Sequence, residues 1–250
     1  MKKSIIIMGL GEMGGVFARG FLCLGHPVYP VTRQVNPAQA VTACPDPDLV
    51  LIAVAEKDFF QSLESIPKAW KSKIALLQNE LLPDIWTSRG IENPTVISVW
   101  FEKKKGQDVK VLLPSPVFGP QADTISEALA ALDIPTTILS SSAELTQALV
   151  MKNLFVFTIN IAGLAVGGTT GQLLENHRRL AEEIFSDIVA LQKVQAKIDL
   201  DGQQLFADFA TALNADPDHK CRGRSAPERL IRAIETAKLF NIRTPALDKV

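Results

Sequence analysis

The feature that most constrains the fold is a GxGxxG motif near the amino end of the chain. Its glycines directly follow an apolar run at residues 5–8 and lead into a helical pattern at residues 14–24. In this context the first glycine permits a tight turn, the second lets the backbone approach a pyrophosphate, and the third lets helix and strand pack closely. The phosphates would bind the free amides at the positive end of the helix. The motif therefore predicts a dinucleotide site made by Gly9, Leu10, Gly11, Glu12, Met13 and Gly14.

From residue 4 to about residue 140 the chain alternates short β-rich runs with helical patterns. Such alternation is typical of βαβ units, in which helices pack on a parallel sheet. The run at residues 48–54 is apolar at consecutive positions, as expected of a central strand covered on both faces. The expected strands are residues 5–8, 28–32, 49–54, 74–78, 96–101, 109–113 and 137–139, and the expected helices include residues 14–24, 59–66 and 124–132.

The character of the chain changes at Ser141. Ser141 and Glu144 fit a capping box, which predicts a long helix that starts there and ends at the pair Gly167 and Gly168. Two further helical patterns follow, at residues 172–196 and 226–239, with nothing strand-like between them. We therefore expect an α/β fold with two domains. Residues 1–143 would form a Rossmann-type parallel sheet domain, and residues 144–250 an all-helical domain.

Composition and charge exclude several classes of protein. The chain has 26 basic and 27 acidic residues among 250, so its formal net charge of -1 provides no global field that would recruit nucleic acid or an anionic membrane. The uncharged stretch at residues 153–174 approaches membrane-spanning length, but its glycines and Asn160 favour a buried helix. We expect neither a nucleic-acid nor a membrane partner, and a cytoplasmic location.

The cysteines and the main basic cluster suggest no special site. Cys23, Cys44 and Cys221 are too widely spaced for a disulfide framework or a zinc site, which indicates a reducing compartment. The sequence offers no His, Asp and Cys combination at usable metal-ligand spacing, so we expect no bound metal. We expect the basic cluster around Gly106 to be a solvated hairpin turn rather than a binding patch; its members are Lys103, Lys104, Lys105 and Lys110.

The residues after the second expected strand bear on which nicotinamide the chain prefers. An acid at this position usually accepts hydrogen bonds from the ribose 2′-hydroxyl, whereas an arginine accommodates a 2′-phosphate. Here the sequence has Thr32 and Arg33 with no carboxylate nearby, which favours NADP over NAD. The alternative is that Arg33 is an ordinary surface arginine after a strand.

The long helix contains two polar residues suited to carbonyl chemistry. Lys152 and Asn160 are eight residues apart, so they project to broadly the same side of the helix. The apolar residues around Lys152 would destabilise its ammonium by desolvation and make it a better proton donor near neutral pH. A lysine that extends its charge to solvent at the edge of the domain is an equally good interpretation.

Several stretches, in order along nearly the whole chain, resemble the ketopantoate reductase family, the 2-dehydropantoate 2-reductases. They are GLGEMG at residues 9–14 with His26 and Arg33 after it, DLVLIAVAEKDF at 48–59, ALLQNEL at 75–81, VFGP at 117–120, MKNLFVFTINIAGLAV at 151–166, GQL at 171–173 and NIRTPALDKV at 241–250.

The resemblance implies a Rossmann domain followed by a helical domain like the C-terminal domain of 6-phosphogluconate dehydrogenase, which would bind substrate and form a homodimer. NADPH would deliver hydride to the ketone of a 2-oxo acid. Lys152 matches the catalytic lysine, the general acid, and Asn160 a substrate-contacting asparagine. The glycines and Arg33 match phosphate-binding elements, and Asn79 an asparagine near the nicotinamide. We also expect Ala53, Val54 and Ala55, after the third strand, to contact the cofactor.

Departures from the family pattern argue against ketopantoate itself as the substrate. Val156 stands four residues after the lysine, where the family has an asparagine. Ala55 replaces a lysine usual after the third strand, with Lys57 available only by a shift. The family's carboxylate near the start of the last long helix aligns with Ser225, or with Glu228 if the alignment is shifted; both are candidate substrate contacts.

Three functions remain open on the sequence. The first is an NADP-dependent reductase of a small 2-oxo acid or related carbonyl. The second is a non-catalytic NADP-binding protein that has lost part of the substrate site. The third is an enzyme like the 3-hydroxyacid or pyrroline carboxylate reductases. We expect His26 to be structural, His177 to lie solvated on a helix surface, and the loop with His219 and Arg224 to be a weaker candidate for anion binding.

Overall fold

The computed structural model describes residues 2–250, which divide into two compact units. The first extends to Ala148 and the second is Leu149–Val250. The boundary expected from the sequence, between residues 143 and 144, lies slightly before this division at 148/149. The observed division falls inside one long helix, α6 (Ser142–Val166), which starts in the first unit and continues into the second.

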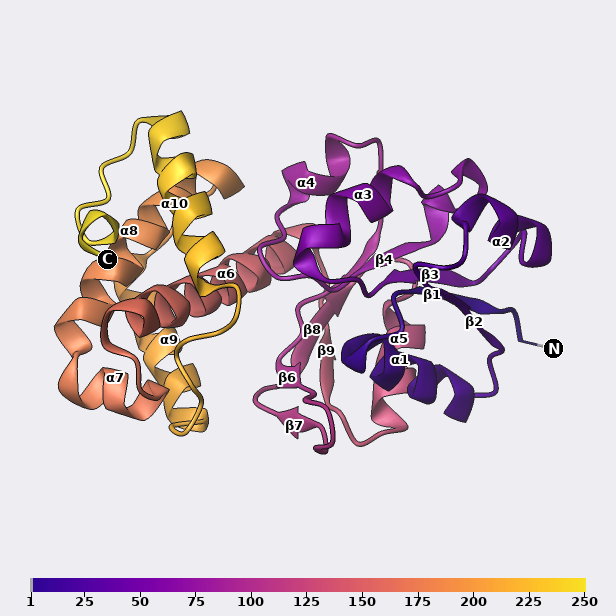
Figure 1. The fold of residues 1–250 in the computed structure, drawn as a ribbon, viewed down its shortest axis with the longest axis horizontal. Coiled ribbons are helices and arrows are strands. Elements are labelled where there is room, and N and C mark those ends of the chain that lie inside the picture. The colour runs from indigo at the N-terminus through magenta and orange to yellow at the C-terminus, as the bar shows by residue number, and fades with distance from the viewer. Residues whose placement is uncertain (1) are drawn as a thin grey trace. The chain divides into compact units, whose positions relative to one another are not determined.

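A sheet that is seven-stranded within residues 2–250 forms the centre of the first unit, with the order β2-β1-β3-β4-β5-β8-β9 (Figure 1). Strand β8 pairs antiparallel with β5, and the pairs β1–β2, β1–β3, β3–β4, β4–β5 and β8–β9 are parallel. The expected α/β class, a mostly parallel sheet followed by helices, is confirmed. The strands are β1 (Ile5–Met8), β2 (Val28–Val31), β3 (Leu49–Ile52), β4 (Ile74–Leu76), β5 (Thr95–Ile97), β8 (Ser115–Phe118) and β9 (Thr136–Ile138).

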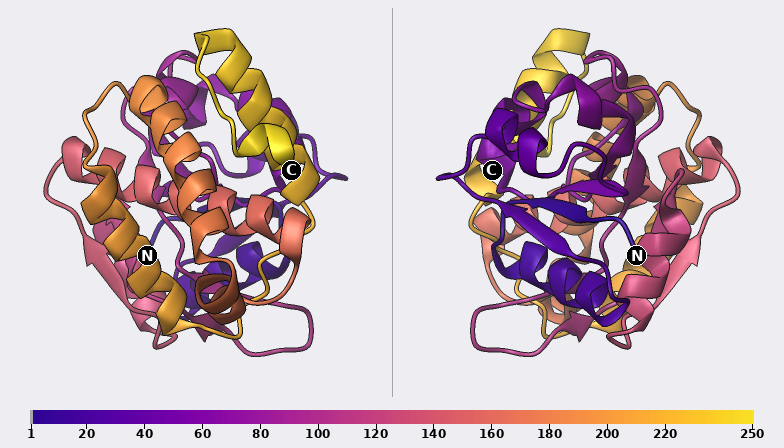
Figure 2. Two further views of the ribbon diagram at one scale, coloured as in Figure 1. Left: turned by 90° about the vertical axis from the view of Figure 1, so that its left-hand side faces the viewer. Right: turned by 90° about the vertical axis from the view of Figure 1, so that its right-hand side faces the viewer.

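Helices cover both faces of this sheet. On one face lie α1 (Glu12–Cys23) and α5 (Ala122–Ala130), and on the other α2 (Pro37–Ala43), α3 (Phe59–Glu64) and α4 (Pro83–Thr87) (Figures 1 and 2). Burial on both sides explains why β1 and β3 are apolar at every position, with each of their residues at most 4% exposed. Helices α1 and α5 pack closely because Gly20 leaves room for the Ala128 carbonyl.

Several expected elements of this unit differ in the structure. The chain leaves the sheet after β5, so the strand expected at 96–101 is too long, and residues 109–113 do not join the sheet. Instead β6 (Phe101–Glu102) and β7 (Lys110–Val111) form a separate antiparallel hairpin, and its lysine-rich turn includes Gly106 at a φ of 74°. Strand β8 is missing from the predictions because it is short and contains Pro116.

The second unit is helical within the described residues, as expected, but its helices are divided differently. It contains the rest of α6, then α7 (Thr170–Asn176), α8 (Arg178–Ala196), α9 (Gly202–Ala215) and α10 (Ala226–Phe240) (Figures 1 and 2). The single helix expected at 172–196 is wrong, because the chain breaks at His177 between α7 and α8. His177 is exposed, as expected, but it lies between two helices and not on the surface of one. Helix α9 had not been expected.

Both ends of α6 follow from local sequence. The Ser141 hydroxyl accepts from the Glu144 amide at 3.2 Å, as a capping box requires. The Glu144 carboxylate, however, accepts from the amide and hydroxyl of Ser140 at 2.8 and 2.7 Å, one residue before the expected partner. At the other end Gly167 and Gly168 take positive φ angles of 65° and 75°. Helix α6 is long and apolar enough to cross a membrane, but 72% of its most apolar window is buried inside the protein.

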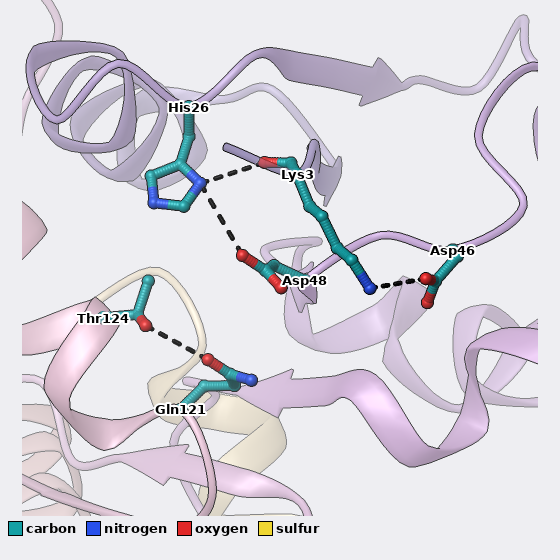
Figure 3. A network of polar contacts seen from close by, with 6 residues as sticks. All are labelled: Lys3, His26, Asp46, Asp48, Gln121 and Thr124. Atoms are coloured by element: carbon teal, nitrogen blue, oxygen red, sulfur yellow. Dashed lines mark hydrogen bonds and ion pairs between the residues drawn. The ribbon is translucent and has the colours of Figure 1, made fainter. Parts of the chain in front are cut away.

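His26 ties together the amino ends of three strands, as expected of a structural residue (Figure 3). Its Nδ1 lies 3.0 Å from the carbonyl oxygen of Lys3, before β1, and 4.0 Å from the Asp48 carboxylate, before β3. Lys3 in turn forms an ion pair with Asp46 at 2.5 Å. Because the glycine motif follows the carboxyl end of β1, this cluster lies at the opposite edge of the sheet from the expected dinucleotide site.

Candidate active site

The glycine motif forms the loop between β1 and α1, and each glycine meets a different spatial demand. Gly9 has a φ of 92°, and a Cβ there would lie 2.7 Å from the Ala53 carbonyl oxygen. A Cβ at Gly14 would overlap the Gly9 carbonyl. A Cβ at Gly11, by contrast, would meet no atom of the described residues within 4 Å. Gly9 and Gly14 are therefore required by the fold, whereas the open space at Gly11 suits close approach of a ligand to the backbone.

A cavity of about 540 Å³ opens beside this loop within the first unit. The loop and α1 contribute Leu10, Gly11, Glu12 and Arg19 to its wall, and the β6–β7 hairpin contributes Lys103 and Asp108. The hairpin contacts the start of α1, because the Lys103 amine lies 3.9 Å from the Glu12 carboxylate. The same amine donates to the carbonyls of Lys104 and Gln107 within the hairpin. The basic turn that we expected to be merely solvated therefore contributes Lys103 to the wall of this cavity.

The residues after β2 are exposed, and their neighbour comes from a distant part of the chain. The side chain of Arg33 is 82% exposed, and its guanidinium donates to the Asp58 carboxylate at 2.7 Å. Asp58 ends a short 3₁₀ turn, Glu56–Asp58, after β3. The expectation that no carboxylate lies near Arg33 is therefore wrong, because it considered only neighbours in sequence, and β3 brings an acid to the same edge of the sheet.

The segment after β3 borders the glycine loop, and the segment after β4 contacts the segment after β3. Ala53 donates its amide to the Met8 carbonyl at 2.7 Å, and Val54 lies against Gly9. Ala55 is exposed and precedes the 3₁₀ turn, in which Lys57 is also exposed. Asn79, after β4, donates to the Glu56 carboxylate at 3.3 Å. Most of the expected cofactor residues of the first unit therefore line the carboxyl edge formed by β1, β3 and β4.

Lys152 lies on α6 in the second unit. Burial, and after it the positive charge of Arg229, together lower the pKa of its amine to about 7. The ammonium also lies 5.6 Å from the centre of the Phe155 ring. An amine with this pKa is partly protonated near neutral pH and gives up its proton more readily than an ordinary lysine, which suits a general acid.

Asn160, two turns further along α6, is buried and held from both ends of its amide. Its nitrogen donates to the Cys221 carbonyl at 3.3 Å, and its oxygen accepts from the Arg229 guanidinium at 2.7 Å. Gly223 packs against the same amide oxygen. Val156, between the two polar residues, is 7% exposed and contributes only apolar surface. The structure thus links Asn160 to the start of α10.

The first turn of α10 shows which of its residues points inward. Ser225 precedes the helix and makes no capping hydrogen bond within the described chain, and Glu228 is exposed. Arg229 is the buried charged residue, at 6% exposure. Sequence reasoning missed Arg229. Which of Glu228 and Arg229 points inward depends on where the helix begins, and the sequence left that start uncertain. In the loop before α10, His219 lies 3.6 Å from Asp216, while Arg222 and Arg224 are exposed.

The two units thus offer complementary chemistry. The first has a glycine loop with an open approach to backbone amides, and the second has an amine with a lowered pKa beside a buried guanidinium. Within residues 2–250, no three His, Cys, Asp or Glu side chains gather in a way that could hold a metal ion. All three cysteines, which lie in this described part, are free thiols.

No protein-family model matches the sequence, and a search of curated proteins found no match. Solved structures do share the fold at low identity. The chain is similar to 2-dehydropantoate 2-reductase from Methylococcus capsulatus, with a TM-score of 0.72, 14% identity, and coverage of 98% of this chain and 94% of the other. It is also similar to a D-mandelate dehydrogenase solved with NADH, with a TM-score of 0.70, 14% identity, and coverage of 98% and 95%.

A third similar structure is the dimeric ketopantoate reductase from Staphylococcus aureus, with a TM-score of 0.67, 16% identity, and coverage of 98% of this chain and 95% of the other. The similarity extends over both units in all three cases. The resemblance expected from the sequence motifs is therefore confirmed at the level of the fold: this chain has the two-part fold of the ketopantoate reductases.

Proposed function

We propose that this protein is an NADP-dependent oxidoreductase that reduces a small 2-oxo acid or a related carbonyl compound, with Lys152 as the general acid. The observation that carries the proposal is the amine of Lys152, whose pKa is lowered to about 7 in a chain that also has an open glycine loop. An ordinary surface lysine would keep its proton near neutral pH and would be a poor acid.

The residues of the first unit fit a dinucleotide. Gly9 and Gly14 shape the loop, and the open space at Gly11 leaves the α1 amides accessible to a diphosphate. We assign Leu10, Glu12 and Met13 to the same contact, Arg33 to the adenosine end, and Asn79 to the nicotinamide end. When bound, a reduced nicotinamide supplies the hydride for reduction of a carbonyl carbon.

The second unit would bind and protonate the substrate. Lys152 donates a proton to the carbonyl oxygen as negative charge develops there. Its positive neighbour Arg229 favours a substrate that carries a carboxylate, because a buried guanidinium and the protonated Lys152 amine both attract an anion. Val156 offers no hydrogen bond at the next turn of α6, which disfavours ketopantoate and its hydroxyl group. The similar D-mandelate dehydrogenase was solved with anilino(oxo)acetate, an oxo acid derivative with an aromatic group.

The test is NADPH oxidation measured against a panel of 2-oxo acids of increasing size. We expect turnover with at least one member, and Lys152→Ala should reduce kcat by roughly 10²- to 10⁴-fold, the usual contribution of a general acid. Lys238→Ala, an exposed lysine of α10, is the matched control and should leave kcat unchanged. Turnover that survives Lys152→Ala would overturn the assignment of the general acid.

A second candidate is a non-catalytic NADP-binding protein. It is favoured by the Asn160 amide, because both of its ends are engaged by Cys221 and Arg229. NADPH binding without turnover on any carbonyl of the panel would support this alternative over the reductase. Turnover on a 3-hydroxyacid or on a cyclic imine would instead favour the third group of enzymes.

We further propose that the protein acts as a homodimer in the cytoplasm. Exposed apolar side chains occur on α10, where Ile231 is 56% and Leu239 78% exposed, and surfaces of this kind are typical of interfaces. The similar Staphylococcus aureus enzyme is dimeric. Light scattering at micromolar concentration should give about twice the mass of the chain, and a purely monomeric result would contradict the proposal.

A further inference from the structure

The ion pair between Arg33 and Asp58 lies at a particular point of the first unit. Arg33 follows β2 and Asp58 follows β3, and the sheet order puts β1 between these two strands. The glycine loop leaves the same edge from the end of β1. The pair therefore joins the two segments that flank the glycine loop, on the side where the adenosine ribose of a bound dinucleotide is recognised.

Local structure prepares both side chains for this contact. Arg33 lies in a turn in which the Val35 amide donates to the Thr32 carbonyl at 2.9 Å, so its side chain projects from the tip of the turn. Asp58 immediately precedes α3 but does not cap it through its side chain within the described chain. Its carboxylate is therefore available for Arg33, at 2.7 Å.

We propose that Asp58 is a specificity-determining residue that competes for Arg33 and makes the protein accept NADH as well as NADPH. This inference rests on the proposed function. To bind the 2′-phosphate of NADPH, Arg33 must break its ion pair with Asp58, and the Asp58 carboxylate repels the phosphate. When NADH binds instead, Arg33 keeps its ion pair with Asp58, and the Asp58 carboxylate accepts a hydrogen bond from the ribose 2′-hydroxyl.

The exposure of the pair makes this exchange feasible. Arg33 is 82% and Asp58 32% exposed, so water and salt screen their attraction, and the pair opens at little cost. A phosphate, with more charge and more acceptor oxygens than a carboxylate, can therefore displace Asp58 from the guanidinium. The result is a modest difference in affinity between NADPH and NADH, and not absolute selectivity for one of them.

The experiment measures the Kd values of NADPH and NADH by fluorescence titration at fixed ionic strength, with no substrate present. For Asp58→Asn we expect NADPH to bind about two- to fivefold more tightly, the range of an exposed ion pair, and NADH to bind about fivefold more weakly through loss of the hydrogen bond. The ratio of the two constants should therefore change by about tenfold or more. Asp58→Glu, which keeps the carboxylate, should restore a ratio near that of the wild type.

Glu64→Gln is the matched control, because Glu64 is an exposed acid of the adjoining helix α3 and its replacement removes the same charge. An unchanged ratio in Asp58→Asn, or an equal change in Glu64→Gln, would overturn the proposal for Asp58. Failure of the wild-type protein to bind either nucleotide would be a different result, because it would refute the dinucleotide site and the proposed function with it.

Discussion

The two regions that carry the candidate chemistry are built in different ways. The glycine loop of the first unit offers backbone amides and open space, with exposed charges such as Arg33 around it. The cluster of the second unit consists of the buried Asn160 and Arg229, which are hydrogen-bonded, and of Lys152, whose pKa is lowered by desolvation and by the charge of Arg229. Changes at Gly11 or at the exposed charges of the first region should therefore alter ligand binding with little effect on folding, whereas changes in the second should alter stability and proton transfer together.

The largest effect is expected at Gly11. Gly11→Ala should fold normally, because a Cβ there has free space, but it should block approach of a diphosphate to the α1 amides. Loss of two charge-assisted hydrogen bonds at about 1.5–3 kcal/mol each weakens NADPH binding by roughly 10²- to 10⁴-fold. Fluorescence titration measures the affinity, and thermal unfolding the stability. Gly202→Ala, in the second unit, is the control and should leave the NADPH affinity unchanged. Unchanged affinity in Gly11→Ala would refute diphosphate binding at the glycine loop.

Arg229→Met tests whether the buried cluster of the second unit links binding to stability. It leaves the buried Asn160 oxygen without its guanidinium donor, which should lower the free energy of unfolding by about 1–3 kcal/mol. Urea unfolding measures this loss. Arg224→Met, at an exposed arginine of the preceding loop, should have almost no effect. Equal stabilities for the two variants would show that the buried contact contributes nothing.

The pH dependence of the reaction tests Lys152 directly. A general acid acts in its protonated form, so with a pKa of about 7 the value of kcat/KM should be constant below that pH. Above it, kcat/KM should fall about tenfold per pH unit as the amine loses its proton. In Arg229→Met the repulsion from the guanidinium is gone, so the fall should begin at higher pH. A fall that begins at the same pH would exclude Arg229 as a cause of the lowered pKa.

The smallest effect is expected at Asp187, a buried residue of α8. Its carboxylate accepts from the amides of Ala246 at 2.7 Å and Leu247 at 3.1 Å, and so holds the C-terminal segment to the helix. Burial raises the pKa of this carboxyl, despite the two hydrogen bonds. Asp187→Asn keeps one acceptor oxygen but removes the charge, which should cost about 1 kcal/mol in urea unfolding. A loss of unfolding free energy in Asp187→Asn as large as that in Arg229→Met would contradict the expectation that Asp187 has the smallest effect.

The fold could be predicted well wherever short-range signals are strong. The apolar runs at β1 and β3, the glycine motif and the glycine pair after α6 each have a local cause, and the structure has these elements where the sequence predicts them. Prediction failed at β8, where Pro116 hides a short strand, and at residues 172–196, where the helical pattern continues across the break at His177. At β8, pairing with β5 and β9, and not local preference, decides the backbone.

The sequence by itself determined the glycine loop and the lysine on the long helix, because both depend on spacing within one continuous segment. Only the tertiary structure decided that Asp58 contacts Arg33, that Arg229 and not Glu228 turns inward, and that Asn160 is held from two sides. These contacts join residues between 25 and 69 positions apart. Such pairs depend on strand order and helix phase, which no single stretch of sequence encodes.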